Sequence, residues 1–365
     1  MEFRIDRQRF LQALSLAQTV VERRPSMPIL SHVRLDAEEG QLVCTSTDTM
    51  LSLVQRTDAE VGEPGTVVLG AKHLYDLVRT FADGPVDVRS LDNGWARITS
   101  GSSEVKLMGL LPEDFPEVPV ADKASLVAVP AHELSALVAG TLFSVSTDDA
   151  RPNLNAGLLE SDGRTMTMVT TDGHRLARYR RKIKGPKFPQ GILIPRKGLL
   201  EMRRVLEPLE GDVEIGVRKD HLFLRTPAWT LTIRLTNARF PAYEAVIPKA
   251  HTRRIVADRD LLLGALRQAA VLAPQQNATV RLHVEGDALE ITADNPELGQ
   301  SRRVIDVEFS GDPLTAGFNA NYLIDALEAA DTEQVALELT GELDPCVVRP
   351  IDGPDYLAVV MPMRL

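Results

Sequence analysis

The stretch Thr170-Thr171-Asp172-Gly173-His174-Arg175-Leu176-Ala177-Arg178 joins two segments that each have the pattern of a β-strand. The first, from Thr165 to Thr170, alternates polar and apolar residues, as a strand with one buried face does. Asp172-Gly173 is a strong hairpin signal, because a tight primed turn needs a backbone with positive φ. A second strand is expected from Arg175 to Arg181. The pattern predicts a hairpin whose tip presents Thr171, His174, Arg175 and Leu176.

Two interpretations of this tip follow from its residues alone. An Asp-Gly hairpin is most often only a polar turn. Alternatively, Asp172 and His174 could act as an acid–base pair. No G-x-S-x-G sequence or other nucleophile motif completes such a site. The polar turn is therefore the stronger of the two.

The composition is that of an ordinary globular protein. The 365 residues suggest two or three domains, and 44% are hydrophobic and 25% charged. No apolar run approaches the roughly 18 residues that a spanning helix needs, and no signal-peptide pattern opens the chain. Cys44 and Cys346 are the only cysteines, which favours a reducing compartment. We therefore expect a cytoplasmic protein with no membrane partner and no disulfide framework.

The net charge is −10, from 41 basic and 51 acidic residues. This balance argues against a protein that grips nucleic acid over its whole surface. It leaves room for a local basic lining within an acidic body.

The first third of the chain alternates helical and strand patterns. Phe10, Leu14, Ala17 and Val21 have helical spacing within Arg7 to Arg24, and Pro25 and Pro28 follow. Strand patterns follow at Val33 to Leu35, Leu42 to Thr47 and Leu51 to Thr57. A second helix is expected at Ala71 to Phe81, and further strands continue to Leu110.

This plan recurs twice at a nearly constant offset. Helix residues Phe10, Leu134 and Leu261 lie 124 and 127 residues apart, and the strand-ending residues Asp48, Asp172 and Asp294 lie 124 and 122 apart. The second helices are expected to begin at Lys72, Lys197 and Asn321, and Phe115-Pro116 matches Phe240-Pro241. A repeat of about 120 residues is the size of a domain and longer than a solenoid unit. We predict three similar tandem α+β domains with antiparallel sheets, at residues 1–122, 123–250 and 251–365.

Catalytic and cofactor motifs are missing from the sequence. There is no Walker A and no G-x-G-x-x-G sequence, and His132-Glu133 lacks the second histidine of a zinc-protease motif. A hydrolase of unknown type and a scaffold or binding module remain as function classes, and the residues favour binding. No cofactor, metal or catalytic residue is expected.

Basic residues recur on or near the expected helices. Scattered arginines and lysines usually mark a solvated helix face. They could instead form a mildly basic lining for a polyanion, held by long-range attraction to phosphate. The candidate DNA-binding residues are Arg24, Arg79, Arg196, Lys197, Arg203 and Arg204.

Several motifs resemble those of the bacterial replicative DNA sliding clamps, the beta subunits of the replicase. They are the tip sequence Thr171 to Ala177, the chain end Val359-Val360-Met361-Pro362-Met363-Arg364-Leu365, the segment Arg24 to Leu30, and Pro195-Arg196-Lys197-Gly198. The resemblance covers the whole chain. It implies a head-to-tail homodimer whose six domains close a ring, with helices lining the hole and sheets outside.

The resemblance also implies a function without catalysis. A sliding clamp encircles double-stranded DNA without sequence preference and holds the replicative polymerase on it. The family receives partner peptides in a groove between its second and third domains. By resemblance the groove residues here are Leu154, Thr171, Gly173, His174, Arg175, Leu176, Pro241, Val246, Leu343, Val359, Val360, Met361, Pro362, Met363, Arg364 and Leu365.

The same resemblance implies the interface and the partners. One side of the dimer interface would lie near Val105 and Leu107, and the other near Val271 and Leu272. The implied partners are the catalytic subunit of DNA polymerase III, a clamp loader complex, repair polymerases, ligase and mismatch-repair proteins.

Overall fold

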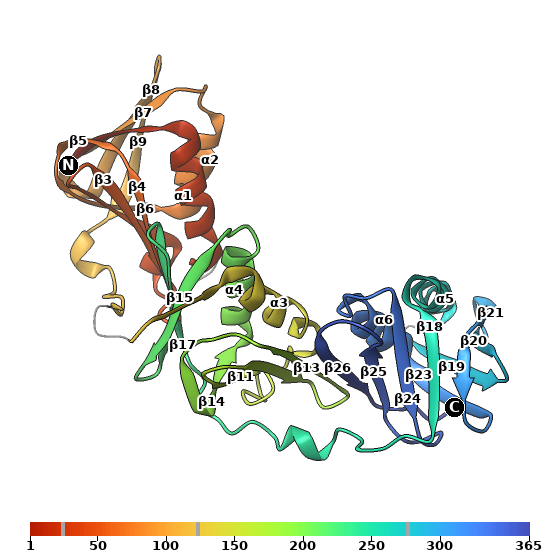
Figure 1. The fold of residues 1–365 in the computed structure, drawn as a ribbon. Helices are drawn as coiled ribbons and strands as arrows, with labels where there is room; N and C mark the ends of the chain where they lie inside the picture. Colours follow the sequence, from red (N-terminus) through yellow and green to blue (C-terminus); the bar gives the residue numbers. More distant parts are fainter. Residues whose placement is uncertain (23–25, 122–124, 275–277) are drawn as a thin grey trace. The chain divides into compact units, whose positions relative to one another are not determined.

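A computed structural model describes residues 1–22, 26–121, 125–274 and 278–365 (Figure 1). The chain forms two compact units. The first unit comprises Met1–Val129 and Gly211–Leu235, and the second comprises Pro130–Glu210 and Thr236–Leu365. No helix of the described residues is long and apolar enough to cross a membrane.

Within its described residues, the first unit has two α-helices and one continuous antiparallel sheet of thirteen strands. Their order in the sheet is β10-β15-β16-β17-β4-β3-β2-β6-β9-β8-β7-β1-β5. In chain order the elements are β1 (Glu2–Asp6), α1 (Arg7–Val20), β2 (His32–Glu38), β3 (Gln41–Thr47), β4 (Leu51–Asp58), β5 (Glu60–Glu63), β6 (Gly65–Gly70), α2 (Ala71–Thr80), β7 (Pro85–Ser90), β8 (Trp95–Ser100), β9 (Ser103–Leu110), β10 (Val127–Pro130), β15 (Asp212–Arg218), β16 (His221–Arg225) and β17 (Trp229–Arg234).

Helices α1 and α2 lie against each other on the sheet and form the core of this unit with it. Asp6 caps α1, because its carboxylate accepts hydrogen bonds from the backbone N–H groups of Gln8 and Arg9. Phe10 and Leu14 of α1 are fully buried and share one apolar cluster with the inward residues of β1 to β3, β7 and β8. The polar residues Gln8, Gln12 and Ser15 of α1 are exposed on the side away from this core.

Helix α1 is shorter than the apolar spacing predicted. The predicted helix from Arg7 to Arg24 was wrong at its end, since α1 stops at Val20 and Val21 is extended. Two β-branched residues in succession lower the helix propensity there. The other expected elements of this region appear within a few residues of their predicted bounds.

In the part that the structure describes, the second unit has four α-helices, a nine-stranded sheet and a four-stranded sheet, and both sheets are antiparallel. The strand orders are β14-β11-β12-β13-β26-β25-β24-β18-β22 and β21-β20-β19-β23. In chain order the elements are α3 (Ala131–Ala139), β11 (Ala156–Asp162), β12 (Met166–Thr171), β13 (Arg175–Arg181), β14 (Lys187–Pro195), α4 (Arg196–Leu206), β18 (Arg253–Asp258), α5 (Arg259–Leu272), β19 (Thr279–Glu285), β20 (Ala288–Asn295), β21 (Gly299–Asp306), β22 (Glu308–Ser310), β23 (Leu314–Asn319), α6 (Ala320–Glu328), β24 (Gln334–Leu339), β25 (Cys346–Pro350) and β26 (Asp355–Val360).

The predicted hairpin is formed by β12 and β13, but its turn differs from the predicted tight primed turn. The last strand pair is Thr171 with Leu176, so the loop has the four residues between them. Only Gly173 of this loop has a positive φ, at 93°. The Asp172 carboxylate closes the loop by accepting hydrogen bonds from the backbone N–H groups of His174, at 2.9 Å, and Arg175, at 3.0 Å.

The hairpin of β3 and β4 has the same turn 124 residues earlier. Asp48 accepts hydrogen bonds from the N–H groups of Met50, at 2.8 Å, and Leu51, at 2.6 Å. The Thr47 hydroxyl donates to the Leu51 carbonyl at 2.8 Å, as Thr171 does to Arg175 at 2.7 Å. The two turns are therefore structural copies of each other.

The third expected copy of this turn is different. Asp294 lies within β20 and does not end the strand. The turn residue is Asn295, whose side-chain oxygen accepts a hydrogen bond from the Glu297 N–H at 3.0 Å. The prediction for Asp294 was wrong because the third loop begins one residue later. The second helices do begin at matching places, each one residue before the expected Lys72, Lys197 and Asn321.

The copied turn predicts that glycine is favoured at both tips, so that two reciprocal substitutions should have opposite effects on stability. Thr49 has a φ of 75° where the later turn has Gly173. Holding an L-residue in the left-handed region costs about 1–2 kcal/mol, and glycine avoids this cost. Part of the gain in stability is offset, because glycine makes the unfolded chain more flexible. We expect Thr49→Gly to raise the free energy of unfolding by up to about 1 kcal/mol in urea titrations. Gly173→Thr should lower it, and an equal effect of both changes would contradict this account.

Candidate functional site

The candidate site lies where β13 pairs with β26 in the nine-stranded sheet. It is on the face of the sheet opposite the helices, which we call the outer face. Leu176 is opposite Val359 and Arg178 is opposite Leu357 in this pairing. Side chains alternate between the two faces of a strand, so Leu176, Val359 and Leu357 share one face. Strands from the second and third repeats thus form one continuous surface.

This surface has an apolar floor. Leu176 and Val359, both predicted as groove residues, are buried there. Seven further floor residues and two partly buried neighbours were not predicted. These residues are Ala156, Leu158, Val169, Leu193, Tyr243, Val347 and Leu357, with Phe240 and Ile247 against them.

Tyr243 closes one side of the floor. Its ring meets Phe240 edge to face, with the ring centroids 6.4 Å apart, and its hydroxyl donates to Glu160 at 2.8 Å. Burial raises the pKa of the Tyr243 hydroxyl, and the hydrogen bond to Glu160 raises it further. The sequence carried a signal for this residue, since Phe240-Pro241-Ala242-Tyr243 places two aromatics in a connecting segment.

Exposed apolar side chains border this floor and the adjoining chain end. Four of the predicted groove residues are exposed: Val246 at 53%, Leu343 at 55%, Met361 at 42% and Leu365 at 59%. Apolar side chains that remain in water gain free energy when a ligand covers them. Methionine suits a surface that meets varied partners, because its flexible thioether adapts its packing.

The chain end is anchored at two points. The N–H of Met361 donates to the His174 carbonyl at 2.9 Å, and the N–H of Met363 donates to the Gly317 carbonyl at 2.8 Å. The Thr279 hydroxyl also donates to the Met363 sulfur at 3.5 Å. A Cβ on Gly317 would lie 2.6 Å from the Met363 carbonyl oxygen, so glycine is needed at this approach. The segment thereby spans from the hairpin tip to β23.

Other predicted groove residues have structural positions. Val360 is fully buried, and Thr171 is 9% exposed with its hydroxyl in the turn. The carbonyl of Pro241 accepts a hydrogen bond from the N–H of Tyr243, and Leu154 is half-buried beside the loop at Arg151. Pro362 is half-buried and Arg364 is exposed.

Arg175 points to the helix side of the sheet and joins two repeats. Its guanidinium pairs with Asp172 at 3.1 Å and with Asp325 of α6, and it lies 4.4 Å from the ring centroid of Tyr322. His174 stacks on the same ring, with the ring centroids 6.5 Å apart. Only 13% of the Arg175 side chain is exposed. The spacing of residues in the sequence did not predict that Asp325 and Tyr322 contact Arg175.

The hairpin tip also bears on the acid–base interpretation. The Asp172 carboxylate receives two backbone N–H groups and the Arg175 guanidinium. These donors occupy carboxylate lone pairs that a general base would use to accept a proton. The described residues contain no group of three or more His, Cys, Asp or Glu that could hold a metal ion.

The two cysteines are fully buried. Burial raises the pKa of the Cys44 thiol to about 12 and also raises the pKa of the Cys346 thiol. Both therefore remain protonated and inert at neutral pH.

The candidate DNA-binding residues lie mainly on α4. Arg24 falls outside the described residues, and Arg79 is on α2, 3.9 Å from Asp76. Arg196 and Lys197 begin α4, and Arg203 lies 3.8 Å from Glu207. Arg204 pairs at 2.6 Å with Glu201, which is buried.

A cavity of about 740 Å³ brings Arg196 and Arg203 together with Arg151 on the helix side of the second unit. Acidic residues line it too, among them Asp148, Asp325 and Glu328. The charge of this surface is therefore mixed.

The predicted interface residues lie on β9 and at the end of α5. Val105 and Leu107 are half-buried on β9, and only its last two residues pair with β6. Val271 and Leu272 end α5, with Val271 74% exposed. Strand β21 is at one edge of the four-stranded sheet.

Comparison with known proteins gives matches along the whole chain. Family models of the DNA polymerase III beta subunit match in order: the N-terminal domain at residues 1–119, the central domain at 128–242 and the C-terminal domain at 244–364.

Individual relatives match over their full length. The beta sliding clamp of Pseudomonas aeruginosa is 35% identical, and that of Escherichia coli strain K12 is 31% identical, each over 100% of both chains. The crystal structure of the P. aeruginosa sliding clamp bound to griselimycin has a TM-score of 0.95 at 35% identity, with 100% of both chains covered. These matches confirm the predicted fold class of three tandem similar α+β domains.

The position of Arg175 predicts a loss of stability when it is removed. Arg175→Ala would leave two carboxylates without their shared cation and would remove the stacking on Tyr322. We expect the free energy of unfolding to fall by about 2–3 kcal/mol in urea titrations. Arg180→Ala is the control, because Arg180 is 44% exposed and 3.5 Å from Asp355. It should cost less than about 1 kcal/mol, and a similar loss in both variants would refute the special role of Arg175.

Proposed function

The chain belongs to the family of bacterial DNA polymerase III beta subunits, the sliding clamps, and we propose that it encircles duplex DNA as a ring of two chains. The observation that carries this proposal is the threefold repeat, matched along the whole chain by the three beta-subunit domain models. Two chains supply six similar domains, and a head-to-tail contact between them can close a ring. The proposed domains are residues 1–122, 123–250 and 251–365.

We propose that the ring closes through the edges of β9 and β21. Both strands have backbone groups free to pair along an edge, and natural proteins seldom leave such edges uncovered. Glu104 on β9 and Arg302 on β21 carry opposite charges that would attract across the contact. Val105 and Leu107 of one chain would approach Val271 and Leu272 of the other, giving an apolar centre to the contact.

The proposed contact with DNA is weak and independent of sequence. A chain with a net charge of −10 gains little from general attraction to phosphate. Arg24, Arg79, Arg196, Lys197, Arg203 and Arg204 would orient the duplex through phosphate contacts that any sequence offers. The closed ring would then retain the DNA by topology.

The apolar floor and its exposed border are the proposed docking site for partner peptides. The groove would comprise the predicted residues with Leu158, Leu357 and Tyr243 added. Arg175 would support the groove from the helix side by holding the hairpin tip. Proposed partners are the polymerase III catalytic subunit, a clamp loader complex, repair polymerases, ligase and mismatch-repair proteins.

We propose no catalytic activity and no cofactor for this chain, and we propose that it acts in the cytoplasm. The alternative of a hydrolase at Asp172 and His174 is disfavoured by the hydrogen bonds that the Asp172 carboxylate already accepts. A binding scaffold without a ring is the second alternative, and DNA topology distinguishes it.

Retention on circular DNA tests the ring. The chain is loaded on nicked circular DNA with a clamp loader and separated by gel filtration at moderate salt. We expect it to remain on the circle and to leave after a restriction enzyme linearises the DNA, because it can slide off free ends. Equal retention before and after the cut would refute the proposal.

A matched variant controls this assay. Leu272→Glu would place an unpaired charge in the proposed interface, at a cost of several kcal/mol. The variant should therefore be lost from circular and linear DNA alike. Since Leu272 is half-buried, its melting curve must first match that of the unchanged protein.

The groove predicts unequal effects for two equally exposed methionines. Met361 is 42% exposed at the groove, and Met50 is 43% exposed at the copied hairpin tip of the first unit. We expect Met361→Ala to weaken binding of a fluorescent peptide from the polymerase tail by about tenfold, or 1.4 kcal/mol. Met50→Ala should leave the affinity unchanged. Fluorescence anisotropy measures both, and equal losses would remove Met361 from the groove.

A further inference from the structure

The first unit contains a second copy of the framework that surrounds the groove. Strand β4 pairs with β17 as β13 pairs with β26, and Ser52 is opposite Thr232 where Leu176 is opposite Val359. The Met50 carbonyl accepts the N–H of Arg234 at 2.8 Å, as the His174 carbonyl accepts that of Met361 at 2.9 Å.

The ion pairs beside the two frameworks also match. Arg225 donates to Glu214 at 2.6 Å, and 124 residues later Arg349 donates to Glu338 at 2.9 Å. The same geometry is thus built twice, with different side chains on its outer face.

The two copies differ in what covers the sheet. In the second unit the segment Phe240-Pro241-Ala242-Tyr243 supplies an aromatic ring that joins the floor. In the first unit the corresponding segment is Phe115-Pro116-Glu117-Val118, 125 residues earlier. Phe115 is 6% exposed and corresponds to Phe240, but Val118 stands where the other segment has Tyr243. Valine has neither a ring nor a hydroxyl to fill this space.

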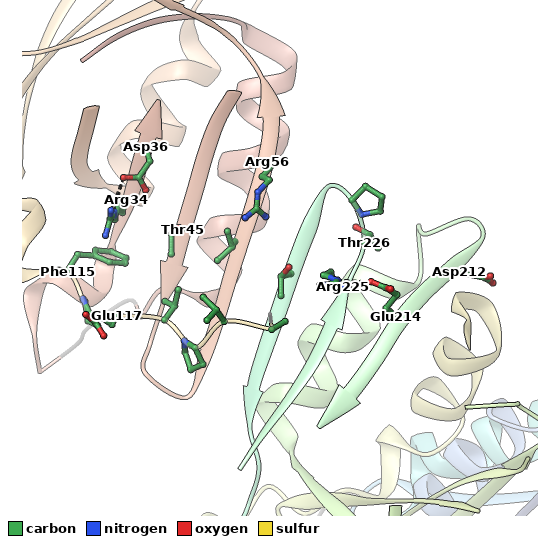
Figure 2. Close-up of a pocket in the computed structure, with 18 residues that line it drawn as sticks. Arg34, Asp36, Thr45, Arg56, Phe115, Glu117, Asp212, Glu214, Arg225 and Thr226 are labelled. Atoms are coloured by element: carbon green, nitrogen blue, oxygen red, sulfur yellow. Dashed lines mark hydrogen bonds and ion pairs between the residues drawn. The ribbon is translucent and has the colours of Figure 1, made fainter. Parts of the chain in front are cut away.

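A cleft of about 1120 Å³ lies between this segment and the sheet. Figure 2 shows the segment that follows Phe115 crossing beside the strands, with Arg34, Asp36 and Thr45 near Phe115. Val54, Val120 and Arg225 also line the cleft. Its volume far exceeds that of one aromatic ring, so it has room for the chain segment that carries a ring.

Asp36 offers the hydrogen-bond acceptor that a phenol needs. It corresponds to Glu160, which accepts the Tyr243 hydroxyl in the second unit at 2.8 Å. Arg34 and Thr66 both donate to Oδ1 of Asp36, at 3.0 and 2.6 Å. Among the described residues no hydrogen bond reaches Oδ2, so this oxygen can accept a hydroxyl.

We propose that the cleft binds a para-substituted phenol, presented as the tyrosine side chain of an extended partner segment. The ring would lie against Phe115 as the Tyr243 ring lies against Phe240, and the hydroxyl would donate to Oδ2 of Asp36. The rest of the segment would follow the cleft along Val54 and Val120. This site is separate from the groove and does not depend on the proposed ring.

Methyl NMR of the full chain with p-cresol tests the site, since p-cresol has the ring and hydroxyl of a tyrosine side chain. We expect saturable shifts of the Val54, Val118 and Val120 methyl signals. Toluene, which lacks the hydroxyl, should bind at least about threefold more weakly, as expected for one lost hydrogen bond. Absence of saturable p-cresol shifts, or equal binding of the two compounds, would overturn the proposal.

A variant that fills the cleft from within gives a second readout. Val118→Tyr places a tyrosine where the second unit has Tyr243. It should abolish the p-cresol shifts and raise the melting temperature, while Val118→Ala should keep the shifts. If Val118→Tyr binds p-cresol as strongly as the unchanged protein does, the assignment is also overturned.

Discussion

The antiparallel pairing of β13 with β26 is the contact on which the second unit depends. Arg175 to Arg180 pair with Val360 to Asp355 without a break, so strands from two repeats share one sheet. A slip of one residue would turn Leu176 away from the outer face and destroy the apolar floor. Contacts on the helix side hold this register, since the rings of Tyr179 and Tyr356 meet edge to face and the Tyr356 hydroxyl donates to the Ala326 carbonyl at 2.8 Å.

The same framework supports different surfaces because the strand backbone tolerates many side chains. Leu158 and Val169 of the second unit correspond to Arg34 and Thr45 of the first, and each pair is directly opposite across its strands. An apolar ligand that covered Arg34 would also remove water from its ion pair with Asp36, which costs free energy. Side-chain polarity on a repeated scaffold therefore gives the two corresponding surfaces of one chain different chemical character.

The hairpin, the repeat and the fold class could be predicted because each rests on local patterns. Strand alternation and the Asp172-Gly173 signal located β12 and β13, and recurring residues revealed the domain-sized period. The exact turn could not be predicted, because it depends on hydrogen bonds from the Asp172 carboxylate. The pairing of Asp325 with Arg175 and of Tyr243 with Glu160 could not be predicted either. Alternation shows which face of a strand a residue occupies but not which distant side chain it contacts. The resemblance to a known family supplied most of the proposed groove residues, while the face of the sheet that Arg175 occupies could be seen only in the structure.

The buried cysteines make this chain convenient for single-molecule fluorescence. Thiols that stay protonated within a closed core do not react with maleimide dyes at neutral pH. Cys44 and Cys346 can consequently remain in place, which preserves the packing of both units. A cysteine introduced at an exposed position such as Leu298, which is 58% exposed, would then carry the only dye. Labelled protein would allow the proposed sliding along DNA to be tested without a cysteine-free variant, whose core would contain two altered side chains.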